Sequence, residues 1–250
     1  MMYPMTDAVK QLMIINVLFF VGTLFVGAPA MNLLGEHYFE NPDFGFWQLF
    51  TNMFIHMGIM HLAFNMLSLY IFGPVLEQRW GASKFIFFYI SCGLGASLAQ
   101  QGIHYFAFHN SVDKLVEIGF DKTDILATLK KGMVDTRWAE NLLPRDYNNL
   151  QGTYFSLAGG ASGAIYGIMV AFAFLFPNVP MMLMFIPIPI KAKYLIAGTL
   201  SLDFYLGFTG QSLFGSVGGV GHFAHIGGAL IGYFIMWYWK KNSFNDRRWN

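Results

Sequence analysis

Charged side chains are scarce in this 250-residue sequence, which has 15 basic and 14 acidic residues, or 12% charged residues in all. A typical soluble domain has about 25%. Hydrophobic residues make up 55% of the chain, more than a soluble fold of this length buries, so a soluble single domain and intrinsic disorder are both excluded. The net charge of +1, without a basic stripe, excludes a nucleic-acid-binding protein.

Cysteine is nearly absent, since Cys92 is the single cysteine of the sequence. No disulfide can therefore form within the chain. Cys92 lies inside an apolar run, and we interpret it as a small core residue rather than a redox group. The sequence also lacks internal repeats, including the inverted repeats typical of transporters.

Five long stretches contain no Asp, Glu, Lys or Arg, namely residues 11–35, 44–76, 85–112, 147–190 and 204–239. An apolar helix needs about 20 residues to cross the roughly 30 Å hydrocarbon layer of a membrane, so each stretch is long enough. The sequence thus predicts an all-α polytopic membrane protein, with one membrane domain over the whole chain, residues 1–250.

Six membrane-spanning helices are predicted within these stretches. They cover residues 12–34, 60–76, 85–105, 159–177, 194–214 and 219–239. The first resembles a signal peptide near Ala28-Pro29-Ala30, but its apolar run is longer than a signal core, which favours an uncleaved span.

An even number of spans places both termini on one side of the membrane. The segments on that side carry nine basic and three acidic residues, whereas those on the other side carry six basic and ten acidic residues. Basic residues accumulate on the cytoplasmic side of membrane proteins. We therefore expect a multi-pass protein of the cell membrane with both termini in the cytoplasm.

Two connections between the predicted spans are unusual. Residues 36–59 are rich in aromatic residues and poor in charge, so this first loop is expected to lie in the outer membrane interface. Residues 106–157 form a polar insertion between the third and fourth spans, facing outward. Within it, Thr123 and Gly132 are expected to cap a short helix.

Uncharged polar residues within the apolar stretches are candidates for function, because a polar side chain buried in a membrane needs compensation. His61 and Asn65 lie four residues apart at the start of the second predicted span and share one helix face. Ser162 lies among glycines at the start of the fourth span, near a helix N-terminus whose free N–H groups favour a developing anion.

His225 of the sixth predicted span lies at helical spacing from Gly228 and Gly232. If the fourth and sixth spans pack through their glycine faces, Ser162 and His225 come within hydrogen-bond reach. They then form a serine nucleophile with its general base. Each motif taken alone has a structural explanation: His61 and Asn65 can hydrogen-bond to neighbouring helices, and a serine among glycines in a membrane helix more often serves helix packing.

A metal site is an alternative to this interpretation, because His56, His61, His222 and His225 are four possible ligands. No acidic or thiol ligand accompanies them, and a metal leaves the serine and asparagine motifs unexplained, so no metal is expected. We interpret His222 as a surface or packing residue. Asp203, the one acidic residue within a predicted span, is interpreted as a hydrogen-bonded structural residue rather than the ion site of a transporter.

Four motifs in this order resemble the rhomboid family of intramembrane serine proteases over nearly the whole chain. The matching residues are Trp47, Phe50, Thr51, Phe54, His56, His61 and Asn65; Gly73, Glu77 and Gly81; Gly160, Ser162, Gly163, Tyr166 and Gly167; and Ala224, His225, Gly228 and Gly232.

The resemblance implies a six-helix rhomboid-type bundle. It implies an intramembrane serine endopeptidase that cleaves transmembrane segments of membrane proteins near the outer side of the bilayer. Ser162 is then the nucleophile and His225 the general base of a dyad without an acidic third partner, so Asp203 is not needed. The resemblance also implies that the protein's partners are transmembrane-helix substrates and membrane lipids, and that it needs no cofactor. The fifth span of the protein, with Gly207 and Gly210, is expected to be a mobile gate.

The resemblance also implies supporting roles. His61 and Asn65, with the backbone at Ser162 and Gly160, hold the oxyanion. Tyr166 stacks on the base, and Gly228 belongs to the helix-packing motif. His56 braces the first loop, and Glu77 ties down the cytoplasmic end of the second span.

One residue departs from the family pattern. Gln48 stands where an arginine commonly follows the tryptophan, a change expected to alter how the first loop meets lipid headgroups. A rhomboid-like protein that binds transmembrane clients without cutting them is the alternative. Loss of Ser162 or His225 would mark it, and both are present.

Overall fold

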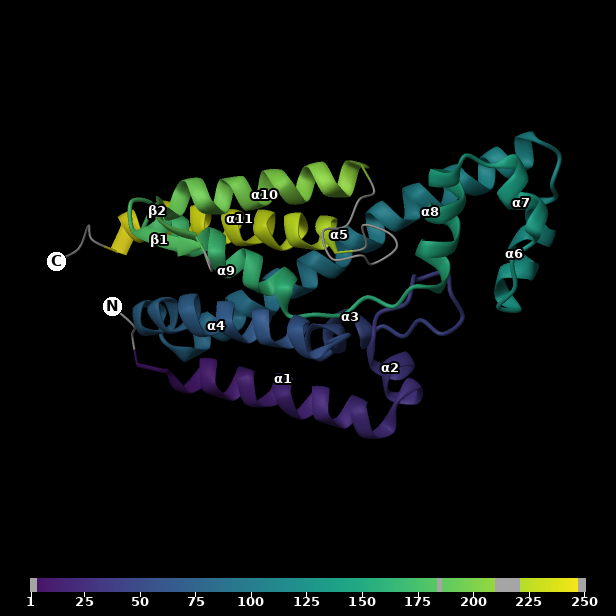
Figure 1. The fold of residues 1–250 in the computed structure, drawn as a ribbon. Coiled ribbons are helices and arrows are strands. Elements are labelled where there is room, and N and C mark those ends of the chain that lie inside the picture. The colour runs from purple at the N-terminus through teal and green to yellow at the C-terminus, as the bar shows by residue number, and fades with distance from the viewer. Residues whose placement is uncertain (1–3, 184–185, 210–220, 247–250) are drawn as a thin grey trace.

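The computed structural model describes residues 4–183, 186–209 and 221–246 and is mostly helical (Figure 1). The helices are α1 (Asp7–Val26), α2 (Ala28–Leu34), α3 (Gln48–Thr51), the 3₁₀ helix η1 (Asn52–Phe54), α4 (Ile59–Trp80), α5 (Ala82–Glu117), α6 (Lys122–Lys130), α7 (Thr136–Asn141), α8 (Pro144–Phe155), α9 (Ser162–Leu175), α10 (Ala192–Thr209) and α11 (His222–Asp246).

Helices α1, α4 and α5 are long and apolar enough to cross a membrane, and α9 is a shorter apolar helix. The predicted spans coincide with α1 and α2, α4, α5, α9, α10 and α11, while residues 210–214 and 219–220 of the last two lie outside the described residues. The first predicted span breaks at Gly27, whose φ of 73° suits glycine. Apolar side chains such as Leu24 and Phe25 are exposed along α1, as expected of a helix facing lipid.

The centre of the bundle consists of α5, α9 and α11, and glycines bring these helices close together. A Cβ added to Gly228 would lie 2.0 Å from the carbonyl oxygen of Gly163, and one at Gly232 would lie 2.8 Å from Cα of Gly167. Only glycine permits such an approach. The prediction that the fourth and sixth spans pack through their glycine faces is confirmed.

Glu77, near the end of α4, holds the start of α1. Its carboxylate accepts hydrogen bonds from the backbone of Ala8 and Val9, at 3.0 and 2.9 Å, and from the Thr6 hydroxyl. The rings of Trp80 and Trp239 meet at 5.2 Å. The start of α1 and the ends of α4 and α11 thus share one end of the bundle (Figure 1).

A β-hairpin joins α9 to α10, which corrects the all-helical expectation. Strand β1 (Pro180–Leu183) pairs antiparallel with β2 (Ile186–Lys191), with Pro180 opposite Lys191. Prolines at 177, 180, 187 and 189 exclude a continuous helix here, because proline lacks the N–H that a helix interior needs.

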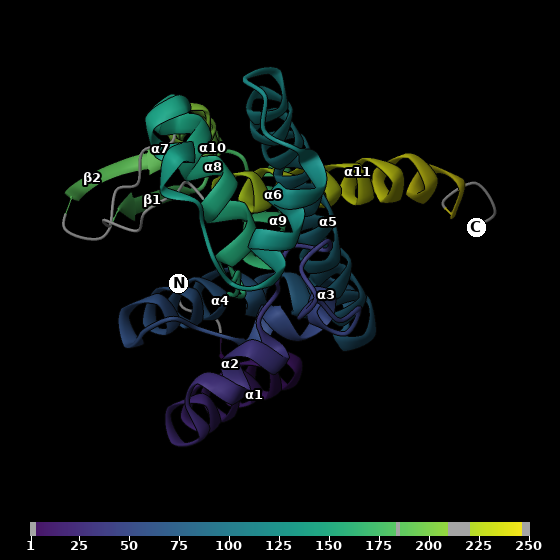
Figure 2. The ribbon, with the colours of Figure 1, turned by 90° about the vertical axis from the view of Figure 1, so that its right-hand side faces the viewer.

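The polar insertion is a small helical unit at the opposite end of the bundle, where α6 and α8 pack on the far half of α5 and α7 packs on α8 (Figures 1 and 2). Helix α5 continues to Glu117, past the predicted end at residue 105, because Phe108, Val112 and Leu115 are buried in this unit. The predicted cap at Thr123 is wrong. Asp121 caps α6 by accepting hydrogen bonds from two backbone N–H groups, and Lys131 is the C-cap ahead of Gly132.

The first loop is fixed by Gln48, which is fully buried. Its amide accepts a hydrogen bond from the backbone of His37 at 3.1 Å and donates to the carbonyls of Asn32 and Asp43 at 3.1 and 3.0 Å. The side chain therefore lies inside the loop. The expected effect of this departure from the family pattern on how the loop meets lipid headgroups stays a prediction. The role of Gln48 is to join α2 to the loop.

Candidate active site

Ser162 is the first residue of α9 and follows a break in the chain direction at Gly160, where φ is 140°. The N–H of Gly160 donates to the carbonyl of Asn52 at 2.9 Å, which anchors the segment before the serine to η1. The N–H of Ser162 lies in the first helical turn, where backbone donors have no partner within the helix. The serine thus sits where an anion is favoured.

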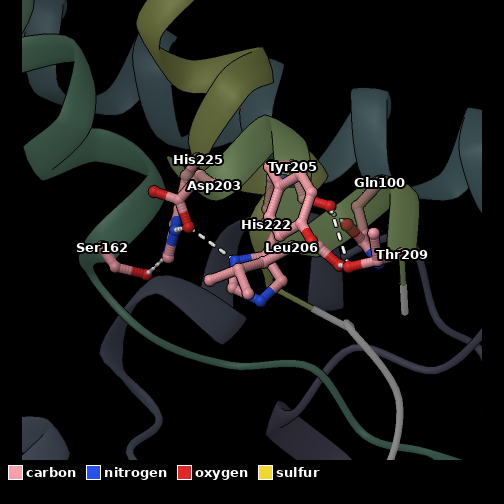
Figure 3. A network of polar contacts seen from close by, with 9 residues as sticks. Gln100, Ser162, Asp203, Tyr205, Leu206, Thr209, His222 and His225 are labelled. Carbon is pink, nitrogen blue, oxygen red and sulfur yellow. Dashed lines mark hydrogen bonds and ion pairs between the residues drawn. The ribbon is translucent and has the colours of Figure 1, made fainter. Parts of the chain in front are cut away.

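Ser162 Oγ lies 2.8 Å from Nε2 of His225, although the two residues are 63 positions apart (Figure 3). The serine comes from α9 and the histidine from the first turn of α11. The close glycine packing of these helices sets the distance. The predicted pair is therefore brought together in hydrogen-bonding geometry.

Tyr166 lies one turn beyond the serine and stacks on the imidazole of His225. Its ring and the imidazole of His225 are nearly parallel, with centroids 4.1 Å apart and an interplanar angle of 8°. Stacking of this kind restricts rotation of the imidazole.

Asp203 contacts both histidines of α11, which differs from the expectation (Figure 3). Its Oδ1 lies 2.5 Å from Nδ1 of His222 and 3.3 Å from Nδ1 of His225. The interpretation of His222 as a surface or packing residue is therefore wrong, because its side chain pairs with a buried carboxylate. An acidic side chain does reach the imidazole of His225.

Ligand atoms of Asp203, His222 and His225 lie within 4.8 Å of one another. The expectation that no acidic ligand accompanies the histidines is thus wrong for His222 and His225. Two ligands on a tetrahedral zinc at 2.0–2.1 Å are about 3.3 Å apart. The 2.5 Å contact of His222 with Asp203 is shorter and describes a direct hydrogen bond.

His61 and Asn65 lie one turn apart on α4, and the His61 ring lies beside the segment that carries the serine. A Cβ added to Gly160 would lie 2.8 Å from the His61 ring and 3.5 Å from Ser162 Oγ, so these groups surround one small space. The Nδ2 of Asn65 is buried and has no hydrogen-bond partner among the described residues. Because a buried unpaired donor is costly, this amide points to a ligand that accepts a hydrogen bond. Gly160 contributes space rather than its N–H, which is engaged by Asn52.

His56 connects the first loop to this space. Its side chain is buried, its Nδ1 lies 3.3 Å from the carbonyl of Phe54, and its ring meets the His61 ring edge-on at 5.1 Å. Burial, with nearby His61 as a smaller cause, lowers the pKa of His56 to about 4. The imidazole is therefore neutral at pH 7 and serves as a packing support.

Gln100 of α5 is a supporting residue that the sequence reasoning missed. Its Oε1 accepts a hydrogen bond from the backbone N–H of Ala224 at 3.1 Å, which holds the first turn of α11 in place. The sequence does contain a signal for Gln100, because it is a polar residue inside a charge-free stretch.

The expected gate lies partly outside the described residues, which end at Thr209 in α10 and resume at Gly221. Gly207 itself is a packing residue, since an added Cβ would lie 3.1 Å from Cβ of His222 and from the ring of Phe223. It lets α10 approach the start of α11 closely.

The apolar helices and the half-buried serine–histidine pair together define the class, a helical membrane protein with a hydrolase-like site. Comparison with known proteins specifies this further. A family model, the Rhomboid domain, matches residues 43–119 and 132–242, well over half of the chain. The chain therefore belongs to the rhomboid family.

Named relatives agree with this assignment. The rhomboid protease AarA of Providencia stuartii is 27% identical over 199 residues, which are 76% of this chain and 54% of that protein. Rhomboid protein 1, mitochondrial, of Saccharomyces cerevisiae is 24% identical over 195 residues, 78% of this chain and 42% of that protein. The rhomboid protease GluP of Bacillus subtilis is 39% identical over 54 residues, 22% and 11% of the two chains. The matches thus span about half or less of these relatives.

Proposed function

We propose that this protein is an intramembrane serine endopeptidase that cleaves transmembrane segments of other membrane proteins. The observation that carries the proposal is the 2.8 Å contact between Ser162 Oγ and Nε2 of His225, in a chain of the rhomboid family. A hydroxyl at this distance from an imidazole nitrogen has its general base in place.

In the proposed reaction, Ser162 attacks the scissile carbonyl while His225 takes the hydroxyl proton. The tetrahedral oxyanion is stabilised by the backbone N–H of Ser162 with His61 and Asn65. The buried, unpaired Nδ2 of Asn65 supports this role, because it lacks a partner until an oxyanion forms. His225 then gives the proton to the leaving amine, and water hydrolyses the acyl-enzyme by the same route in reverse.

Substrate access is proposed between α4 and α10. Helix α4 packs mainly on α1, α5 and α9, whereas α10 packs mainly on α9, α11 and the hairpin, so neither helix depends on the other for its packing. A peptide bond must leave its helical hydrogen bonds before it can reach Ser162, so an unwound part of the substrate helix is the proposed reactant.

The proposed topology has six spans in one membrane domain, residues 1–250, with both termini cytoplasmic in the cell membrane. It is supported by the meeting of the α1 start with the α4 and α11 ends, where Lys10, Arg79, Lys240 and Lys241 gather. The insertion 106–157, at the other end, then faces outward.

The experiment is co-expression of the protein with epitope-tagged single-span membrane proteins whose outer transmembrane ends carry glycine and proline, with product detected by immunoblot. We expect one cleavage product that disappears in Ser162→Ala and in His225→Ala, while both variants reach the membrane at the wild-type level. Product formation that persists in Ser162→Ala would contradict the proposal.

A further inference from the structure

Asp203 of α10 lies on the side of His225 opposite to the serine. The Nε2 of this imidazole faces Ser162 at 2.8 Å, while its Nδ1 faces Oδ1 of Asp203 at 3.3 Å. A serine, a histidine and a carboxylate are thus arranged in series, each on a different helix (Figure 3).

The donors and acceptors of this series fix the position of a proton. An ionised carboxylate only accepts hydrogen bonds, so the Nδ1 atoms of His222 and His225 must both carry a proton to bind Asp203 Oδ1. A neutral imidazole has one proton, so Nε2 of His225 then holds a lone pair directed at Ser162. This is the tautomer that a general base needs.

We propose that Asp203 is a positioning residue for His225, which holds the imidazole in this tautomer and stabilises the imidazolium formed when the proton leaves Ser162. The inference rests on the proposed function and adds a member to the dyad. The proton moves from Ser162 Oγ to Nε2 of His225 and on to the leaving amine, and Asp203 remains ionised throughout.

A purely structural role accounts for less of the geometry. A buried carboxylate in an apolar bundle needs a donor, and His222 alone supplies one at 2.5 Å. A purely structural role leaves unexplained the second contact of Asp203, which is to Nδ1 of His225. In our proposal His222 orients the carboxylate, and Gly207, packed against His222, keeps α10 close enough for Asp203 to reach His225.

The test measures how fast a fluorophosphonate probe labels Ser162 in the detergent-solubilised full chain between pH 5 and 9. We expect Asp203→Asn to slow labelling at least tenfold, because an amide can donate to Nδ1 and favour the wrong tautomer. The pH at which the labelling rate of Asp203→Asn falls on the acid side should also be lower than in the wild type, because the His225 imidazolium has lost the negative charge beside it. Thr199→Val is the matched control, since the Thr199 hydroxyl bonds only within α10 in the described structure.

The pH limb is interpretable because the titratable groups around His225 are known. They are Asp203 of α10, His222 of α11, Tyr166 of α9 and His61 of α4. Only the first is altered by the substitution.

The outcomes separate this inference from the function on which it rests. An unlabelled, folded wild type would overturn the proposed function. A wild type labelled at Ser162, with Asp203→Asn equal to it in rate and pH limb, would overturn the inference alone. Faster labelling of Asp203→Asn would also overturn the inference, since the contact of Asp203 with α11 would then hold α10 in place and slow access to Ser162.

A second measurement keeps the inference testable if Asp203→Asn does not fold. The ¹⁵N NMR spectrum of histidine-labelled wild type, assigned with His225→Ala, reports which ring nitrogen of His225 is protonated. We expect the proton on Nδ1 at neutral pH. A proton on Nε2 would contradict the inference.

Discussion

The imidazole of His225 lies face to face with the ring of Tyr166, at a centroid distance of 4.1 Å and an angle of 8°. The stack fixes the plane of the imidazole, and with it the direction of Nε2 towards Ser162. This relationship gives the first prediction.

We expect Tyr166→Phe to keep most of the activity, because the phenyl ring preserves the stack. Tyr166→Ala should lower kcat about 100-fold, since a misplacement of about 1 Å in a catalytic group has an effect of this size. The comparison is made by the rate of substrate cleavage at saturating substrate. Equal rates for the two variants would show that the stack does not orient the base.

The second prediction concerns the oxyanion donors. Removing one donor should lower kcat about 10²–10³-fold, because its hydrogen bond strengthens only in the transition state. We expect this loss for His61→Ala and for Asn65→Ala, with little change in KM. Asn65→Ala should not destabilise the fold, because Nδ2 of Asn65 has no partner among the described residues. A rise in KM alone would mean that these residues bind substrate only.

The third prediction concerns the contact between α9 and α11. A Cβ at residue 228 would lie 2.0 Å from the Gly163 carbonyl, so Gly228→Ala should destabilise the protein by about 1–3 kcal/mol, the usual effect of overpacking. Gly102→Ala in α5 is the matched control, because an added Cβ there meets no described atom within 4 Å. Thermal unfolding in detergent measures both. Equal melting temperatures would contradict the close packing.

The fourth prediction concerns the pH dependence of stability and involves Glu36 in the first loop. Its carboxylate accepts hydrogen bonds from the side chains of Asn52 and Gln101, while burial raises its pKa from 4.5 to about 7. The native state thus binds more protons than the unfolded state between these values. The contribution of Glu36 to the free energy of unfolding is largest below pH 4.5 and falls by about 3 kcal/mol as the pH rises to 7.

We expect Glu36→Gln to remove this component, so that the melting temperature of the variant changes less than that of the wild type between pH 5 and 8. The difference between the two profiles isolates Glu36 from other titrating groups. Parallel profiles would contradict the assignment.

The glycine spacing on two separate helices explains why the sequence predicted the central pair correctly. Gly163 and Gly167 repeat on one apolar helix and Gly228 and Gly232 on another, so the faces that meet, and therefore the pairing of Ser162 with His225, can be inferred from local periodicity.

The contact of Asp203 could not be inferred in the same way. The sequence shows a lone carboxylate in a predicted span, but its neighbours depend on how α10 packs against α11, which includes the close approach at Gly207. The β-hairpin was missed for a similar reason, because an uncharged proline-rich segment indicates a break without indicating strand pairing. Asp121 and Thr123 are both good helix caps, and only the geometry of the first turn distinguishes them.

The central claim is that Ser162 is a nucleophile activated by His225. Incubation of the detergent-solubilised protein with a fluorophosphonate, followed by intact-mass and peptide mass spectrometry, tests it most directly. We expect one adduct, on Ser162, that is absent in Ser162→Ala and strongly reduced in His225→Ala. Equal labelling of the wild type and Ser162→Ala, or no labelling of a folded wild type, would contradict it.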